Sequence, residues 1–295
     1  MRTIAFMNQK GGVGKTTTTV NLGAALAEAG HRVRLIDLDP QAHLTINFGI
    51  DPTADIVTMY DVLVEDRSAL EAMTQVGERT AVLPGSIDLA AAELELVTVI
   101  GREMLLKKRL EPLTGEFDYI LLDCPPSLGL LTINALALAT EVIIPMQPHF
   151  LALQGFAKLL ETTHLVSRRM NPKLKVAGVV LTMFDTQARL SGEVVAELQG
   201  FVDHARDKPL PWNNAVIFET RIRRNIKLAE SPSFGQHIFQ YDASSNGSTD
   251  YRALAREVMA LDVHASPALK PELSINRDVV PATGADESAS TEQVA

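Results

Sequence analysis

Two lysines enclose a glycine-rich segment close to the start of the chain. Residues 9–17 read QKGGVGKTT, so Gln9 stands where the ordinary phosphate-loop pattern G-x-x-x-x-G-K-[ST] has its first glycine. Glycines let backbone N–H groups close around phosphate oxygens, and the N-terminus of a following helix adds a favourable dipole. We therefore expect phosphate binding here, with Lys15 at the β- and γ-phosphates and the Thr16 hydroxyl on Mg²⁺. The competing interpretation is a plain glycine-rich turn with a solvated lysine.

Two aspartates follow a second apolar run. Asp37 and Asp39 lie in the segment LIDLDPQ, and alternate residues of a strand point to the same side. Two carboxylates next to bound phosphates can hold a metal-bound water or orient an attacking water. An Asp-Pro pair is also common turn chemistry, so either residue could instead cap a turn.

A third aspartate, Asp123, ends the run YILLD and is followed by Cys124 and two prolines. A buried carboxylate is costly unless a cation or hydrogen-bond donors meet it. Bound Mg²⁺ or its water would supply that partner. Cys124 has no base or second cysteine beside it in the sequence, so we interpret it as a small packed residue and not as a nucleophile.

Strands alternate with helices along most of the chain, and this order must position the three motifs. The alternation predicts an α/β fold, a doubly wound and mostly parallel sheet with helices on both faces. Ligands of such sheets bind beyond the carboxyl ends of the strands, where all three motifs lie. We expect strands at 3–8, 32–37, 118–123, 141–145 and 176–183, and helices at 16–29, 151–170 and 249–261.

The composition excludes several classes of protein. With 295 residues, 46% of them hydrophobic and 21% charged, the chain can build a large core and is not disordered as a whole. A single cysteine excludes a disulfide scaffold and a cysteine-rich metal site within one chain. No apolar run is long enough to span a membrane and no secretory signal is evident, so we expect a reduced cytosol. The net charge of −9 allows DNA binding only through a local basic patch.

The folded part is predicted to end near residue 262. Residues 263–295 are rich in Ser, Thr, Pro, Glu and Ala and lack apolar periodicity. We therefore predict one domain over 1–262 and a disordered tail over 263–295.

The doubled-lysine loop resembles the deviant Walker A loop of the ParA/MinD group of ATPases, which are three-layer α/β/α P-loop NTPases. The resemblance implies that ATP is bound, and that Lys10 crosses to the partner's nucleotide in an ATP-sandwich homodimer. The segment around Asp37 and Asp39 resembles the group's Walker A′ motif, and that around Asp123 its Walker B strand. These similarities imply that Asp39 positions the hydrolytic water and that Asp37 lies in the outer shell of the metal. They also imply that Thr16 and Asp123 bind Mg²⁺ or its water. The loop residues implied to hold the nucleotide are Lys10, Gly11, Gly12, Val13, Gly14, Lys15, Thr16 and Thr17.

Segments further along resemble one branch of this group, the Soj-like ParA proteins of chromosome and plasmid partition. They are residues 123–135, 142–148, 151–156, 178–185 and 225–235. The resemblance is to the short form without an N-terminal DNA-binding domain. It implies a cytoplasmic, nucleoid-associated ATPase that dimerises with ATP and then binds double-stranded DNA non-specifically. It also implies a ParB-like centromere-binding protein that stimulates a slow hydrolysis.

A basic cluster offers a candidate DNA surface. Four basic residues lie within seven positions, Arg221, Arg223, Arg224 and Lys227, and we expect Arg189 and Lys208 to extend the cluster. The alternative is an ordinary solvated helix edge, because two glutamates flank the cluster. The family often has proline at position 223, next to a base-binding asparagine. The resemblance implies that Asn225, with Arg223 beside it, belongs to the nucleotide site, although the arginine departs from the family pattern.

Other functions on the same framework stay open. One is a ParA-like ATPase that positions a cargo other than DNA, which nothing in the residues excludes. A MinD-like membrane regulator would need a basic amphipathic C-terminal helix, whereas this tail is acidic and broken by prolines. A cluster-carrying relative would need paired cysteines. The partition-like segments disfavour a metabolic ligase of the same fold.

Overall fold

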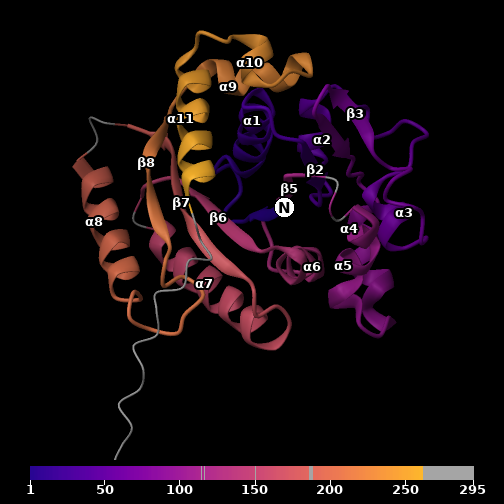
Figure 1. Cartoon of the computed structure of the whole chain (residues 1–295), viewed down its shortest axis with the longest axis horizontal. Helices are drawn as coiled ribbons and strands as arrows, with labels where there is room; N and C mark the ends of the chain where they lie inside the picture. Colours follow the sequence, from indigo (N-terminus) through magenta and orange to yellow (C-terminus); the bar gives the residue numbers. More distant parts are fainter. Residues whose placement is uncertain (114, 116, 150, 186–188, 262–295) are drawn as a thin grey trace, which may run out of the picture. The chain divides into compact units, whose positions relative to one another are not determined.

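The computed structural model describes residues 1–113, 115, 117–149, 151–185 and 189–261. In this part of the chain one eight-stranded sheet has the order β3-β4-β2-β5-β1-β6-β7-β8 (Figure 1). All neighbouring strands are parallel except β3 and β4, which are antiparallel. The strands are β1 (Arg2–Phe6), β2 (Val33–Asp37), β3 (Thr74–Gly77), β4 (Thr80–Leu83), β5 (Tyr119–Asp123), β6 (Glu141–Met146), β7 (Lys175–Phe184) and β8 (Val216–Arg223).

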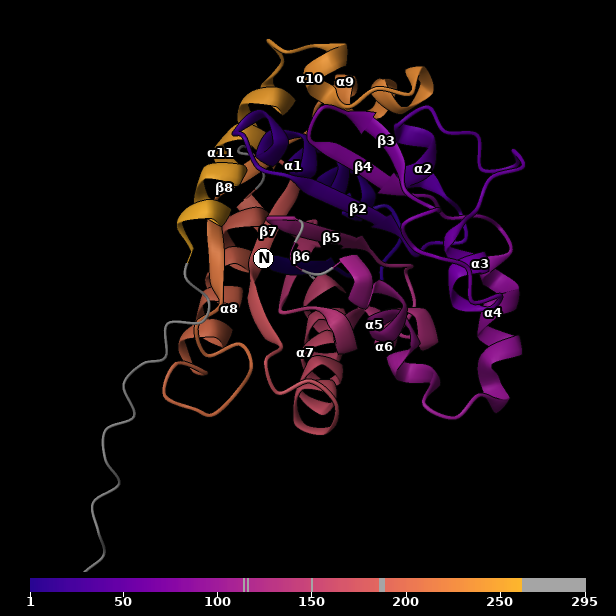
Figure 2. The same cartoon turned by 45° about the vertical axis from the view of Figure 1, so that its right-hand side comes forward.

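Helices cover both faces of the sheet (Figure 2). On one face lie α1 (Lys15–Glu28), α2 (His43–Asn47), α9 (Ile226–Glu230), α10 (Ile238–Tyr241) and α11 (Asn246–Ala260). On the other lie α3 (Met59–Leu63), α4 (Leu89–Glu95), α5 (Leu105–Leu110), α6 (Leu130–Leu138), α7 (Leu151–Arg169) and α8 (Arg189–Asp203). The predicted doubly wound, three-layer α/β/α fold is confirmed. Within the described ranges, every helix is too short or too polar to span a lipid bilayer.

Alternation along the central strands builds a separate core on each face. In β1, Ile4 and Phe6 join the core under α1 and α11, whereas Ala5 joins the core under α6 and α7. Successive strand residues point to opposite faces, and a parallel sheet covered on both sides buries both sets. The continuous apolar runs in the sequence are the consequence. Helix α1 packs closely on β2, because a Cβ atom at Gly23 would lie 2.9 Å from Leu35 Cδ2.

The register of the central strands brings the motifs together. Asp123 at the end of β5 is the partner of Phe6 on one side and of Asp37 on the other. The loop after β1 and the acidic ends of β2 and β5 therefore meet at one edge of the sheet.

The last strand, β8, forms one edge of the sheet, and carboxylates of α11 bind its backbone. The N–H groups of Glu219 and Thr220 donate to the Glu257 carboxylate at 2.7 and 2.8 Å. The N–H of Arg223 donates to Asp250 Oδ2 at 3.0 Å. The backbone N–H groups of an edge strand have no strand partner on the outer side, so α11 satisfies three of them with carboxylates.

The described residues fall within one compact unit, Met1–Val263. The predicted tail, 263–295, lies outside the described residues, and its disorder stays a prediction.

Candidate nucleotide-binding site

The glycine-rich segment forms a closed loop between β1 and α1. Gly12 and Gly14 have φ angles of +72° and +82°, which side chains other than glycine rarely adopt. Neighbouring side chains hold the loop, since Thr182 Oγ1 donates to the Val13 carbonyl at 2.7 Å and Lys10 N donates to Asn8 Oδ1 at 3.0 Å. The loop is thus preshaped for an anion at the N-terminus of α1.

Lys15 is buried at the base of this loop, and its Nζ donates to the Lys10 carbonyl at 3.4 Å. Burial lowers the pKa of the Lys15 ammonium, while the nearby carboxylates of Asp123 and Asp39 oppose that shift. A buried cation beside a phosphate-shaped loop is the arrangement that phosphate binding requires.

Thr16 and Asp123 are joined directly. Thr16 Oγ1 donates to Asp123 Oδ2 at 2.6 Å, and Thr19 Oγ1 donates to the other carboxylate oxygen at 3.2 Å. Burial and the neighbouring Asp37 raise the pKa of Asp123 to about 8, against the effect of the Thr16 hydrogen bond. The protein groups around Asp123 alone therefore compensate the negative charge of its carboxylate poorly. A hydroxyl backed by this carboxylate is a donor set that fits Mg²⁺.

Asp37 and Asp39 have different surroundings. The Asp37 carboxylate is fully buried and accepts from Thr45 N at 2.9 Å, Thr45 Oγ1 at 2.7 Å and Asp39 N at 3.2 Å. Burial raises its pKa to about 6. Its contacts are with the loop and α2 and not with open space, so its assignment to the outer shell of the metal stays a prediction.

Asp39, in contrast, faces a cavity of about 370 Å³ that Gly11, Gly12, Lys15 and Thr16 also line. Its Oδ1 accepts from Gln41 N at 3.0 Å, which orients the side chain. A carboxylate on the wall of a phosphate cavity can orient a water molecule toward the phosphate.

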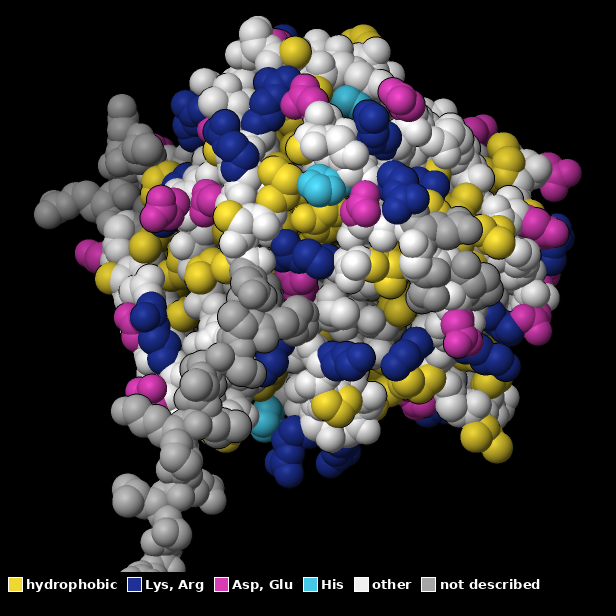
Figure 3. Space-filling model, in the orientation of Figure 1, with side chains coloured by type: hydrophobic (Ala, Val, Ile, Leu, Met, Phe, Trp, Pro, Cys, Tyr) yellow, Lys and Arg dark blue, Asp and Glu magenta, His cyan; other side chains and the backbone are white. Residues whose placement is uncertain are grey.

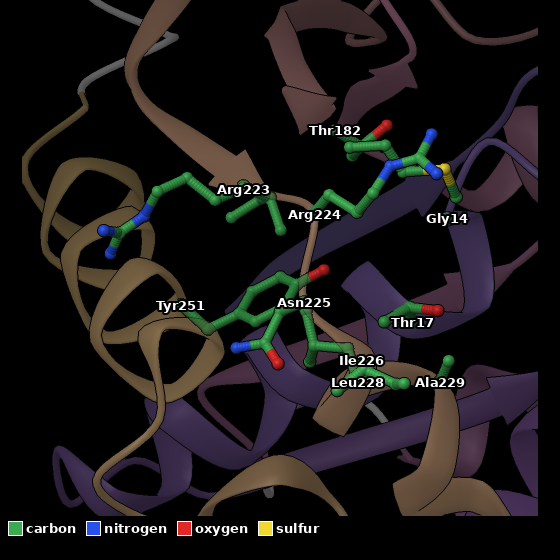
Figure 4. Close-up of a pocket in the computed structure, with 12 residues that line it drawn as sticks. Gly14, Thr17, Thr182, Arg223, Arg224, Asn225, Ile226, Leu228, Ala229 and Tyr251 are labelled. Carbon is green, nitrogen blue, oxygen red and sulfur yellow. The ribbon is translucent and has the colours of Figure 1, made fainter. Parts of the chain in front are cut away.

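A second cavity, of about 420 Å³, adjoins the first, because Gly14 and Thr17 line both (Figure 4). Its other walls come from the ends of β7 and β8, from α9 and from Tyr251 of α11, and they are mostly apolar. Tyr251 is buried, with its hydroxyl 3.3 Å from Thr18 Oγ1. Met183 lines this cavity with a φ of +48°, which is uncommon for a residue other than glycine. The volume is in the range of small-molecule sites.

Arg223 and Asn225 line the second cavity, but their side chains are engaged elsewhere. Arg223 Nη2 lies 2.6 Å from Asp250 Oδ1, and in Figure 4 its guanidinium points away from the cavity toward α11. Asn225 caps α9, with its Oδ1 accepting from Lys227 N at 2.8 Å. The predicted base contacts of these two residues stay predictions.

The basic cluster is less free than its sequence implies. The Arg221 guanidinium lies 5.8 Å from the centre of the Phe184 ring, and Lys227 Nζ lies 3.1 Å from Glu230 Oε2. Acidic side chains lie among the basic ones on the face in Figure 3. Lys208 follows α8 and precedes β8, so it lies at the opposite end of β8 from Lys227 and does not extend the cluster. Arg189 is the first residue of α8, and its side chain lies outside the described part.

Several residues of the site have no signal in the sequence. Lys10 Nζ lies 2.5 Å from Nε2 of His149, in the segment after β6. Thr182 of β7 and Tyr251 of α11 line the second cavity and Asp250 of α11 pairs with Arg223, and only folding brings these residues to the site. Cys124 is buried as expected, and burial raises the pKa of its thiol.

Comparison with known proteins decides the family. A family profile described as an AAA domain matches residues 1–176. A chromosome partitioning protein ParA of Myxococcus xanthus is 44% identical over 267 residues, which cover 90% of each chain. The sporulation initiation inhibitor protein Soj of Bacillus subtilis is 45% identical over 258 residues, covering 87% of this chain and 98% of Soj. The chain belongs to the ParA/Soj family of partitioning ATPases.

A solved relative of this ParA/Soj chain carries a nucleotide. The structure named cobyrinic acid a,c-diamide synthase, from Mycobacterium smegmatis, contains an ATP analogue and magnesium. It is 37% identical with a TM-score of 0.73, covering 88% of this chain and 94% of that one. The resemblance to ParA/Soj proteins is therefore confirmed at the level of the family and of the fold.

Proposed function

We propose that this protein is an ATPase that dimerises with ATP, binds double-stranded DNA non-specifically in that state and acts in chromosome or plasmid partition. The observation that carries the proposal is a cavity lined by Lys15, Thr16 and Asp39, which joins a second, mostly apolar cavity at Gly14 and Thr17. A nucleotide needs these two compartments, a polar one for phosphates and an apolar one for the base.

The residues of the first cavity have separate parts in hydrolysis. Lys15 and the loop N–H groups bind the β- and γ-phosphates, and Asp39 orients a water molecule in line with the γ-phosphorus. Thr16, backed by Asp123, would hold Mg²⁺, which neutralises charge that develops on the phosphate oxygens. Asp37 keeps the Asp39 loop in place through its contacts with Thr45 and the Asp39 amide.

Lys10 is assigned to the partner's nucleotide in a face-to-face dimer. A second cation at the γ-phosphate would stabilise the transition state, as an arginine finger does. Dimer formation also doubles the number of basic groups that face DNA, so DNA affinity follows the nucleotide state. Arg221 and Lys227 are the described candidates for that surface, and a ParB-like protein is the proposed stimulator of hydrolysis. The protein would then act in the cytoplasm, on the nucleoid.

DNA binding in different nucleotide states tests this function. Wild-type protein and Lys15→Ala would be passed over immobilised DNA without nucleotide, with ADP and with ATP and Mg²⁺. We expect DNA binding by wild type in ATP only, faster release when a ParB-like protein is added, and no binding by Lys15→Ala. Equal DNA binding in all three states would contradict the proposal. ATP-dependent dimers without DNA binding would favour a ParA-like role with another cargo.

A further inference from the structure

Arg224 differs from the basic residues on either side of it. Arg223 pairs with Asp250, and Lys227 pairs with Glu230. The Arg224 side chain is exposed, and the described part of the structure gives it no hydrogen bond or ion pair. A guanidinium is always charged and carries five donors, so this side chain is available to an anionic ligand.

The direction of the side chain indicates where that ligand lies. In Figure 4, Arg224 extends from the end of β8 toward Gly14, whereas the neighbouring Arg223 extends the opposite way. Arg224, Gly14 and Thr17 line the same cavity. Gly14 and Thr17 also line the phosphate cavity that contains Lys15 and Asp39. Arg224 therefore lies beside the junction of the two cavities.

A nucleotide that fills both cavities must pass this junction. Its base would occupy the apolar cavity and its β- and γ-phosphates the cavity of Lys15. The group at the junction is then the phosphate next to the ribose. The planar fork of a guanidinium matches two phosphate oxygens, which makes arginine the side chain best suited to this place.

We propose that Arg224 binds the α-phosphate of the nucleotide and is not primarily a DNA contact, in contrast to its grouping with Arg221 and Lys227 in the sequence. The inference rests on the proposed function in one respect, that the ligand is ATP or ADP. Lys227 lies three residues further along the same segment, and its N–H donates to the Asn225 side chain at 2.8 Å. A phosphate held by Arg224 therefore orders the segment that also carries a DNA-binding candidate.

Nucleotide affinity of charge variants tests the assignment. The dissociation constant for ADP with Mg²⁺ would be measured by calorimetry for wild type, Arg224→Gln, Arg224→Lys and Arg67→Gln. Arg67 is a matched control, because it is also exposed and its ion pair with Glu71 lies on the surface of the same chain. We expect about a tenfold loss of ADP affinity for Arg224→Gln and about a threefold loss for Arg224→Lys. Arg67→Gln should bind like wild type.

Two comparisons make the outcome decisive. The loss in Arg224→Gln should shrink as salt is added, because it is a loss of charge attraction. An ADP affinity equal to that of wild type would overturn the inference, whether or not DNA binding changes. If wild type binds ADP but never binds DNA, the proposed function fails while the Arg224 assignment is still tested by its own variants.

Discussion

The Nζ atom of Lys10 lies 2.5 Å from the Nε2 atom of His149 in the single protomer. The lysine assigned to a partner's nucleotide thus has an intramolecular partner, contributed by the segment after β6. This contact must break before Lys10 can reach across a dimer interface. His149 is therefore a competitor for Lys10 when no partner is bound.

Removal of His149 should favour the dimer. A hydrogen bond of this kind contributes about 1 kcal/mol and two of them break in each dimer, so His149→Ala should lower the dimer dissociation constant in ATP by roughly thirtyfold. Sedimentation velocity in the presence of a non-hydrolysable ATP analogue measures the change. The effect should vanish in a Lys10→Ala background, and a His149→Ala effect that persists there would contradict this explanation.

Lys15 is expected to be essential for nucleotide binding. Lys15→Ala removes the buried cation below the loop and should weaken ATP binding by at least about a hundredfold. Lys10→Ala is the control, because Lys10 is exposed and should matter for the dimer more than for binding to one protomer. Tight ATP binding by Lys15→Ala, measured by calorimetry, would refute the loop assignment.

Substitution of Asp39 should impair hydrolysis, whereas substitution of Asp37 should impair stability. Asp39→Ala should keep ATP and DNA binding while hydrolysis falls by about a hundredfold or more, since only water orientation is lost. Asp37→Ala should instead lower the free energy of unfolding by about 3 kcal/mol, because it leaves the buried Thr45 donors without an acceptor. Phosphate release and urea unfolding measure the two effects. Normal turnover by Asp39→Ala would remove it from the catalytic role.

The DNA surface can be located by salt dependence. Arg221→Ala with Lys227→Ala should reduce the slope of log affinity against log salt by about two per protomer, one for each lost phosphate contact. Lys208→Ala is the control, because Lys208 lies at the other end of β8. A slope unchanged from wild type would place the DNA surface elsewhere.

His237 should make the fold sensitive to acid. Burial lowers its pKa to about 4, although the Glu28 carboxylate, itself paired with Arg252, opposes the shift. The unfolded chain binds a proton near pH 6.5 and the folded chain does not, so this contribution to stability is present above pH 6.5 and is lost as the pH falls toward 4. The free energy of unfolding of His237→Phe, measured in urea and compared with that of wild type, should therefore rise by about 2 kcal/mol between pH 7 and pH 4.5. The control His204→Gln, at an exposed histidine, should show the same pH dependence of unfolding as wild type. The same pH dependence for His237→Phe as for wild type would contradict the explanation.

The sequence predicts the part of the fold that local patterns encode. Five central strands and the three predicted helices, α1, α7 and α11, lie within a few residues of their predicted bounds, because buried parallel strands are continuous apolar runs and the helices carry periodic apolar residues. Strand β8 was not predicted, since FETRIR has only two apolar residues, Phe218 and Ile222, three polar residues lie between them, and the strand is partly exposed at the edge of the sheet. The phosphate loop was predicted because its glycines and lysines are adjacent in sequence. The pairs Arg223–Asp250 and Lys10–His149 join residues far apart in the chain, and only packing of the sheet brings them together.

The two carboxylates by which α11 binds the edge strand β8 have a consequence at high protein concentration. Proteins that gather on a polymer reach high local concentrations. Under those conditions an edge strand with free backbone N–H groups would form hydrogen bonds with the same strand of another molecule. Asp250 and Glu257 already occupy the N–H groups that such pairing would need. This hydrogen bonding therefore opposes pairing of two molecules along the outer side of β8.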